Sequence, residues 1–250
     1  FMVDNMRGLV HGAAATTNDD AQLLANSSAA ESTVGLARPT ATGFDFNWAA
    51  SAKMIYIAIR RGPMKTPTDA TKVFKSGLIR YTSSTGVASF IGGGFPVDMG
   101  LQRNKSLVDN MLVTNRLMRG TILYTNSSGA ESTSSSFNFD YQSGWANVAA
   151  TGTNYINYQF RRAPGFFDIV CYTGDSTAGR TISHNLGVTP EMIICKNRST
   201  SGYPWPTYVA PLGATKSVRL NESAASATQG SYFWNNTAPT STVFTVGTDS

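Results

Sequence analysis

Residues Asn126–Thr133 read NSSGAEST, and this stretch occurs three times in the chain. An earlier copy, NSSAAEST, begins at Asn26, and a later, shorter copy, NESAAS, begins at Asn221. The copies start 100 and then 95 residues apart. A period of this length is that of a small folded domain, because solenoid repeats are only roughly 20–50 residues long. The sequence therefore predicts a tandem array of one module.

Further landmarks recur in nearly the same register. The stretch IRRGP at residues 59–63 recurs as FRRAP at residues 160–164. Gly94–Met99 recurs in outline at Gly187–Met192. The offsets between landmarks drift by a few residues, which places the insertions in loops.

These landmarks predict the boundaries of the repeats. We expect residues 1–63 to be the C-terminal part of repeat 1, residues 64–165 to be repeat 2, and residues 166–250 to be repeat 3 without its last strand. An array cut within a unit at both ends is expected to be a fragment of a longer protein.

The composition bounds the class of protein. Charged residues make up 14% of the chain, and its net charge of +5 is scattered, with no run of five or six like charges. A nucleic-acid footprint would need such clustering, so we expect no nucleic-acid partner. No run of about 18 apolar residues occurs, so we expect no membrane insertion by a helix.

Short runs of β-branched and aromatic residues, bounded by Gly, Pro, Asn and Ser, fill the chain and predict β-strands. In Tyr155–Phe160 alternate side chains point to opposite faces, while Met192–Cys195 is continuously apolar, as in a strand covered on both faces. Phe167–Tyr172 also reads as a strand, and only Asp69–Lys75 and Lys105–Leu117 fit short helices. The pattern predicts an all-β protein of tandem antiparallel β-sandwich modules, jelly-roll-like and about 95–100 residues long. A β-propeller is the alternative.

No group of residues indicates catalysis or metal binding. The two histidines, His11 and His184, belong to no cluster with metal-ligand spacing. Gly92–Gly94 lacks the Lys and Ser/Thr of a phosphate-binding loop. Asp98 recurs as Glu191, and a carboxylate that recurs in each unit indicates a role in the fold rather than in an active site. We expect no enzyme activity, no catalytic residues, no cofactor and no metal.

The two cysteines, Cys171 and Cys195, are expected to be buried free thiols. The matching positions in repeat 2 hold Arg80 and Gln102, so the module does not depend on a disulfide.

Two kinds of residue are candidates for binding. Tyr203 and Trp205 lie in the stretch YPWP, whose prolines stiffen a loop that can offer aromatic faces to sugar rings. The competing interpretation is that Trp205 folds back and closes the end of the sandwich. The pairs Arg60-Arg61 and Arg161-Arg162 each end a strand where one unit leads into the next, and they are candidates for contacts between repeats or subunits.

Several stretches of the C-terminal repeat form a recognisable set, namely Tyr172–Asp175, His184–Arg198, Leu212–Lys216, Leu220–Asn221 and Trp234–Phe244. They resemble a repeated module of large virion proteins from tailed phages, especially marine phages, described as tail-fibre or lectin-like proteins. Repeats 1 and 2 match the same module through their Ala-Glu-Ser and Arg-Arg landmarks. The resemblance therefore covers most of the chain. It implies a β-rich fold, a place on the virion surface or tail, outside the cell, and oligomerisation. It implies neither a ligand nor catalytic residues.

We therefore expect a non-enzymatic virion structural protein, a tail-fibre or appendage segment. Its expected partners are further copies of itself in a homo-oligomer, with a trimer as one option, other virion proteins, and host-cell surface polysaccharide. The alternative is a purely structural decoration or tail component that binds only virion proteins. A polysaccharide-degrading tailspike is least favoured, because no unique acidic cleft can be identified.

Overall fold

The computed structural model describes the central and C-terminal parts of the chain almost completely, and short stretches before them. The described residues are 21–22, 24, 27–30, 32–33, 37–39, 44–46, 65–80, 89–118, 120–134, 136–147 and 154–249. Within them every regular element is a β-strand apart from two short 3-10 turns, η1 (Ala70–Lys72) and η2 (Ala210–Leu212). The paired strands are antiparallel, and none of their sheets closes into a barrel. The prediction of an all-β fold is confirmed.

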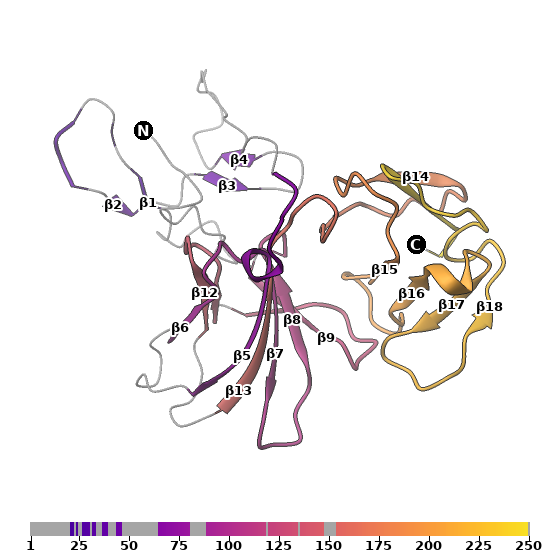
Figure 1. The fold of residues 1–250 in the computed structure, drawn as a ribbon, viewed down its shortest axis with the longest axis horizontal. Helices are drawn as coiled ribbons and strands as arrows, with labels where there is room; N and C mark the ends of the chain where they lie inside the picture. Colours follow the sequence, from indigo (N-terminus) through magenta and orange to yellow (C-terminus); the bar gives the residue numbers. More distant parts are fainter. Residues whose placement is uncertain are drawn as a thin grey trace.

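The strands follow one another in the order shown in Figure 1. They are β1 (Ala21–Gln22), β2 (Ser32–Thr33), β3 (Ala37–Pro39), β4 (Phe44–Phe46), β5 (Phe74–Arg80), β6 (Ser89–Gly92), β7 (Met99–Asn104), β8 (Leu112–Asn115), β9 (Thr121–Tyr124), β10 (Ser132–Thr133), β11 (Phe137–Asn138), β12 (Gly144–Asn147), β13 (Asn154–Phe160), β14 (Arg180–Ser183), β15 (Met192–Ile194), β16 (Pro206–Val209), β17 (Lys216–Arg219), β18 (Ala227–Thr228) and β19 (Val243–Val246).

The central unit, residues 65–162, is a sandwich of two sheets. The larger sheet has the order β10-β9-β8-β7-β13-β5, and the smaller has the order β11-β12-β6. Trp145 of β12 is fully buried between them, stacked on Phe137 and Phe139. Gly100 of β7 faces this indole, and a Cβ at that position would lie 2.5 Å from it. The glycine therefore makes room for the largest side chain of the core.

Buried amides line the inner face of the larger sheet beside Trp145. The side chain of Gln102 donates to Asn157 Oδ1 at 2.8 Å and accepts from Asn147 Nδ2 at 2.5 Å. All three residues are less than 5% exposed. Hydrogen bonding between the amides offsets the cost of burying them, and it ties the two sheets together.

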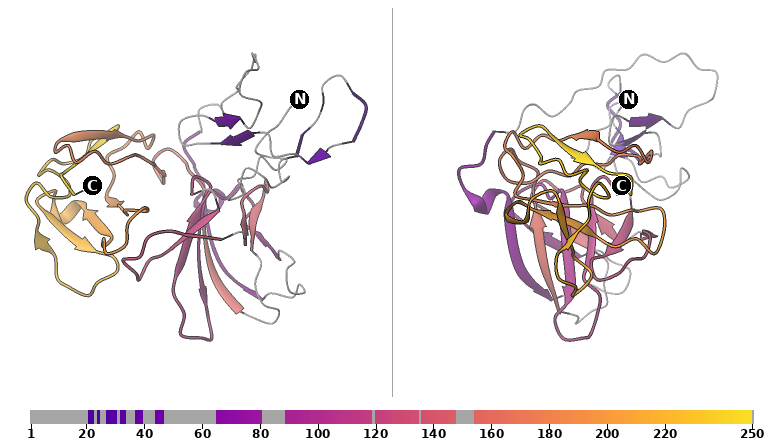
Figure 2. Two further views of the ribbon diagram at one scale, coloured as in Figure 1. Left: turned by 180° about the vertical axis from the view of Figure 1, so that it is seen from behind. Right: turned by 90° about the vertical axis from the view of Figure 1, so that its right-hand side faces the viewer.

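The C-terminal unit, residues 165–249, repeats the two-layer plan in reduced form. One sheet has the order β15-β16-β17-β18, and the other pairs β14 with β19. Its core contains Ile182 and Phe244 from the smaller sheet, Tyr208 from the larger, and Phe233 and Trp234 from the loop before β19. Figure 2 shows the two units lying side by side.

The repeated motif forms the same hairpin in all three copies. In each copy the motif joins two short antiparallel strands, namely β1 and β2, β9 and β10, and β17 and β18. The outermost partners are Ala21 with Thr33, Thr121 with Thr133, and Lys216 with Thr228. The second motif residue donates its N–H to the carbonyl three residues earlier at 3.1 Å in each case: Ser27 to Leu24, Ser127 to Tyr124, and Glu222 to Arg219. The motif is therefore a turn signal that the fold uses three times.

The strands around this hairpin also correspond. The order β7-β8-β9-β10 matches β15-β16-β17-β18, and the pair β6–β12 matches β14–β19. Among the described residues of the C-terminal unit, however, no strand takes the place of β13, which in the central unit lies between β5 and β7.

This difference explains two sequence predictions that were wrong. Phe167–Tyr172 stands where β5 stands in the central unit, but it forms no strand beyond one isolated bridge, Ala163 with Phe167. Met192–Cys195 is not covered on both faces, because Met192 and Ile194 are 58% and 44% exposed. Both segments lie where the central unit uses β13 as a partner.

The two predicted helices were also wrong in large part. Asp69–Lys75 contains only the single turn η1, capped by the Asp69 carboxylate, which accepts from Thr71 N–H at 2.8 Å. Lys105–Leu117 is a loop followed by β8. The apolar residues Leu112 and Val113 belong to a strand in the sheet, and tertiary pairing overrides their weak helical pattern.

Candidate functional site at the junction of two units

The turn of the repeated motif in the central unit forms one half of a contact with the C-terminal unit. The hydroxyl of Ser127 accepts from Gly129 N–H at 3.0 Å and so shapes the turn locally. This leaves the carbonyls of Ser127 and Ser128 free to accept bonds from the other unit. In the C-terminal unit the equivalent residues 222–226 are all exposed, whereas residues 127–131 are half-buried. The difference reflects the contact.

The loop between β15 and β16 forms the other half. The Asn197 carboxamide accepts from the N–H groups of Ser199 and Thr200 at 3.0 Å each, which bends the loop back on itself. Its tip then reaches the motif turn, and Gly202 N–H donates to Ser128 O at 2.9 Å.

Three further hydrogen bonds cross the junction. Glu131 N–H donates to Arg198 O at 2.8 Å. Ala130 N–H donates to Ser201 Oγ at 3.0 Å. The indole N–H of Trp205 donates to Ser127 O at 2.8 Å. These three bonds and the Gly202 bond join eight groups, and five of the eight are backbone or hydroxyl groups of small residues, which pack closely.

Trp205 supplies the apolar part of the junction. It is only 6% exposed and clusters with Val113, Met118 and Leu123 on the outer face of the larger central sheet. Met99 and Leu101 border the same cluster. Because these neighbours all belong to the central unit, the indole is buried by the contact between units and not by its own sandwich.

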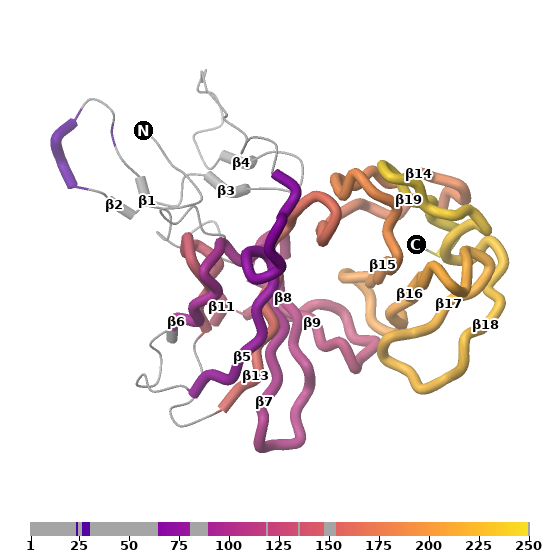
Figure 3. The backbone as a smooth tube through the Cα atoms, viewed as in Figure 1, coloured from indigo at the N-terminus to yellow at the C-terminus, as the bar shows by residue number. Residues whose placement is uncertain are grey.

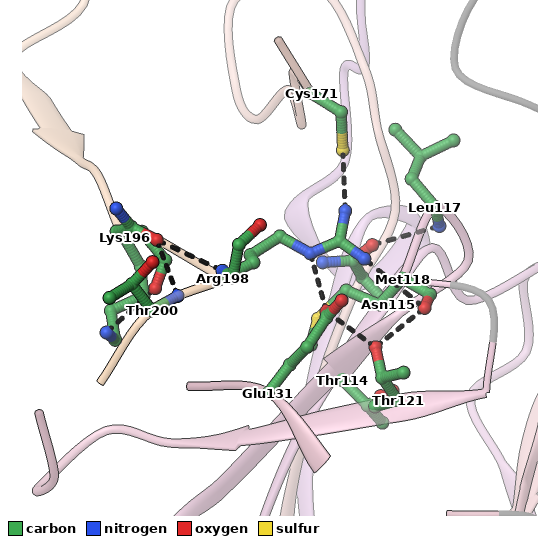
Figure 4. A network of polar contacts seen from close by, with 12 residues as sticks. Thr114, Asn115, Leu117, Met118, Thr121, Glu131, Cys171, Lys196, Arg198 and Thr200 are labelled. Carbon is green, nitrogen blue, oxygen red and sulfur yellow. Dashed lines mark hydrogen bonds and ion pairs between the residues drawn. The ribbon is translucent and has the colours of Figure 1, made fainter. Parts of the chain in front are cut away.

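An ion pair lies beside the tryptophan. Arg198 Nε is 2.7 Å from Glu131 Oε2, and both side chains are about one-third exposed or less. The same carboxylate oxygen accepts from the Thr121 hydroxyl at 2.8 Å. The guanidinium also approaches Met118 O at 3.4 Å and Cys171 Sγ at 3.7 Å, as Figure 4 shows. The geometry holds Arg198 in one position, which an isolated surface pair does not do.

Lys196 completes the junction. Its ammonium donates to the carbonyls of Ser128 at 3.3 Å, Asn197 at 2.9 Å and Tyr203 at 3.0 Å, and it lies 6.0 Å from the centre of the Trp205 ring. Burial lowers the pKa of Lys196 below its usual value. The lysine thus gathers the carbonyls of the loop and of the motif turn around one charge.

The predicted arginine contacts fall partly within the described residues. Arg162 Nε is 2.6 Å from Asp168 Oδ1, and Asp168 in turn accepts from Asn185 N–H at 2.8 Å. Arg162 therefore links the end of the central unit to the C-terminal unit. Arg161 donates its backbone N–H to Val73 O at 2.8 Å, within the central unit. Arg60 and Arg61 lie outside the described residues.

The carbohydrate platform expected at Tyr203 and Trp205 has a different geometry from the one predicted. Trp205 is buried against the central unit, so its ring faces are not open for stacking on a sugar. It does not close the end of its own sandwich either, which was the competing interpretation. Tyr203 is 37% exposed. Sequence reasoning missed Lys196, Arg198 and Glu131 as contact residues, although the recurrence of the glutamate in the motif was the available signal.

The remaining polar residues of interest have structural contacts. His184 is buried, and its Nε2 lies 3.2 Å from Thr240 O. Cys171 and Cys195 are free thiols, but each residue is partly exposed and not fully buried as expected. Cys195 packs against the C-terminal core, which shields its thiol from water. In the part of the chain that the structure describes, no three His, Cys, Asp or Glu side chains gather as metal ligands. No helix among those residues is long and apolar enough to cross a membrane.

Comparison with known proteins gives one match. Residues 165–250, the C-terminal unit, match a protein family described as a domain of unknown function, DUF7483. No curated protein and no solved structure matches the chain. The boundary of the match, at residue 165, coincides with the start of the C-terminal unit.

Proposed function

We propose that this chain is a non-enzymatic structural segment of a phage virion appendage, such as a tail fibre, in which β-sandwich units dock in series to make a stiff shaft. The observation that carries the proposal is the docking of the C-terminal loop onto the repeated motif of the unit before it. A motif that recurs once in every unit and serves as a docking surface suits an array. The resemblance to virion modules supports the place of that array in a phage particle.

The junction supports stiffness because the units are connected at two separate places. One connection is the chain itself, with Arg162 and Asp168 paired beside it. The other is the loop contact, in which Trp205 and Arg198 engage the central sheet. A linker alone would let one unit turn about the other, whereas two connections fix both the angle and the rotation.

The burial of Trp205 favours the purely structural form of the proposal over glycan adhesion. The adhesive alternative retains only Tyr203 of the two predicted aromatic residues as an exposed candidate. In the structural form, the partners are other virion proteins and further copies of the chain.

Stiffness can be measured by pulsed electron paramagnetic resonance between spin labels at S76C and T228C, in a background with both native cysteines replaced by serine. Both labelled positions are exposed, one in each unit. The expected result is one narrow distance distribution that broadens when Trp205 is replaced by alanine. A broad distribution in the parent protein would contradict the shaft. Mass spectrometry of purified particles tests the location, and absence of the chain from them would exclude a virion role.

A further inference from the structure

The outer face of the C-terminal sheet is the counterpart of the face that receives Trp205. In the central unit Met99 and Leu101 of β7 border the buried tryptophan. Met192 and Ile194 of β15 occupy the same two places in the C-terminal unit, and they are 58% and 44% exposed. Leu220, at the end of β17, is also exposed, at 48%. This C-terminal face is therefore apolar, and no described residue covers it as Trp205 covers the central face.

No described residue covers the loop of the central unit that corresponds to the docking loop either. It is residues 105–111, between β7 and β8, and it projects from the end of the central unit in Figure 3. Its tip carries Leu107 and Val108, which are 65% and fully exposed. Exposed apolar residues at a loop tip are a common feature of contact surfaces.

The two loops correspond at both of their ends, and the docking loop is one residue longer. Thr125 N–H donates to Met111 O at 2.9 Å, and Leu220 N–H donates to Trp205 O at 3.0 Å, so Met111 stands where Trp205 stands. Counting from the paired strands β7 and β15, Lys105 stands where Arg198 stands. The central loop thus offers a cation and an apolar side chain in the same order as the loop that docks.

We propose that the C-terminal face, formed by Met192, Ile194 and Leu220, binds the loop 105–111 of a second copy of this chain. The contact is head-to-tail, so it joins copies in a row or a ring, as heterologous interfaces do. This inference rests on the proposed structural role and names the surfaces through which the array is extended between chains. The template is the junction within the chain itself, where the same kind of loop sits on the same kind of face.

The contact between copies differs from the internal junction in two respects. Ser226 stands where Glu131 stands, so the ion pair of the internal junction has no direct copy. The acidic residue nearest to it in the turn is Glu222, which is exposed and lies 3.0 Å from Arg219. Met111 also has less apolar area than a tryptophan. We therefore expect association between copies to be weaker than the internal docking.

The test uses two variants and their mixture. The loop variant carries L107D and V108D, and the face variant carries M192D and I194D. All four side chains are well exposed, so the fold is expected to be retained, which circular dichroism and thermal melting verify. Burying an unpaired carboxylate in an apolar contact is expected to weaken association at least about tenfold.

In sedimentation equilibrium at rising protein concentration, the parent chain is expected to form oligomers, and each variant alone is expected to stay monomeric. A mixture of the two variants is expected to form a dimer and nothing larger, because only one pair of intact surfaces remains. A parent chain that stays monomeric up to about 1 mM would overturn the proposal, since that corresponds to less than about 4 kcal/mol of association free energy. It would also be overturned if either variant associated as the parent does, or if the mixture formed no dimer. The spin-label distance within one chain does not depend on association, so it separates failure of this proposal from failure of the stiff junction.

Discussion

Replacement of Trp205 by alanine is the most direct test of the junction. A tryptophan side chain has roughly 200 Å² of surface to bury. Because Trp205 is only 6% exposed, nearly all of that surface is removed from water. At about 25 cal/mol per Å² the burial is worth up to ~5 kcal/mol, and less once the unfolded chain's own burial is counted. Truncation of a buried tryptophan to alanine costs about 3–5 kcal/mol in other proteins, which agrees.

This loss is expected to fall on the contact between units and not on either core. The neighbours of the indole, Val113, Met118 and Leu123, belong to the central unit, whereas the tryptophan belongs to the C-terminal unit. Trp205→Ala should therefore uncouple the two units while leaving each sandwich folded. In differential scanning calorimetry, the single cooperative transition of the parent chain is expected to split into two. Amide exchange should accelerate at residues 127–131 and not in β13.

Two further substitutions serve as controls. Trp205→Phe keeps most of the apolar surface and removes the indole N–H, so it should cost only about 1 kcal/mol and preserve coupling. Tyr203→Ala removes an exposed side chain two residues away and should change stability by less than about 0.5 kcal/mol. If Trp205→Ala left one transition at an unchanged temperature, or if it unfolded the C-terminal unit alone, the assignment of the indole to the junction would be refuted.

Three other predictions follow from the described contacts. Gly100→Ala should destabilise the central unit by about 1–3 kcal/mol in urea unfolding, because its methyl group would overlap the indole of Trp145. Gly77→Ala in β5 of the same sheet meets nothing within 4 Å and should be neutral or better, and equal effects of the two would contradict the packing argument. Arg198→Met should weaken coupling between the units in a manner that fades at high salt, and a salt-independent effect would show that the charge is not what matters. Burial raises the pKa of Cys195 to about 11 from 9.0, so at pH 8 its thiolate should be about 100-fold rarer in the folded chain than in the unfolded chain. The stability that this raised pKa confers is fully present below pH 9 and lost as the pH rises toward 11. Rapid alkylation of Cys195 in the folded protein at pH 8, located by mass spectrometry, would contradict the assignment.

The all-β architecture was predictable because each strand is marked by a local run of β-branched and aromatic residues. Tyr155–Phe160 was expected to form a strand, and it lies within β13, whose partners cover all seven residues. The face that the strand buries was less obvious. Asn157 and Gln159 point inward and are 1% and 2% exposed, and the Asn157 carboxamide accepts a hydrogen bond from Gln102 within the core. Hydrophobicity alone would have chosen the opposite face, which carries Ile156 and Tyr158 and is only half-buried.

The junction was not predictable from the sequence for a different reason. Its two halves are far apart along the chain, because Ser127 and Trp205 are 78 positions apart. Most of its acceptors are main-chain carbonyls, which every residue possesses and which therefore cannot be recognised from the composition. The tryptophan was recognised as notable, but a sequence cannot show whether an aromatic side chain in a stiff loop meets a sugar, its own core or a neighbouring unit.

The reliance of the junction on main-chain acceptors has a consequence for how such chains evolve. Ser127 and Ser128 contact the other unit through their main-chain carbonyls. Their side chains can therefore be replaced as long as the turn conformation is kept. The C-terminal motif, with Glu222 in place of the first serine, keeps the same turn hydrogen bond despite that change. A module can therefore be duplicated or recombined next to a diverged neighbour without matched substitutions on both sides, and genes for arrays of this kind can lengthen and shorten by whole units.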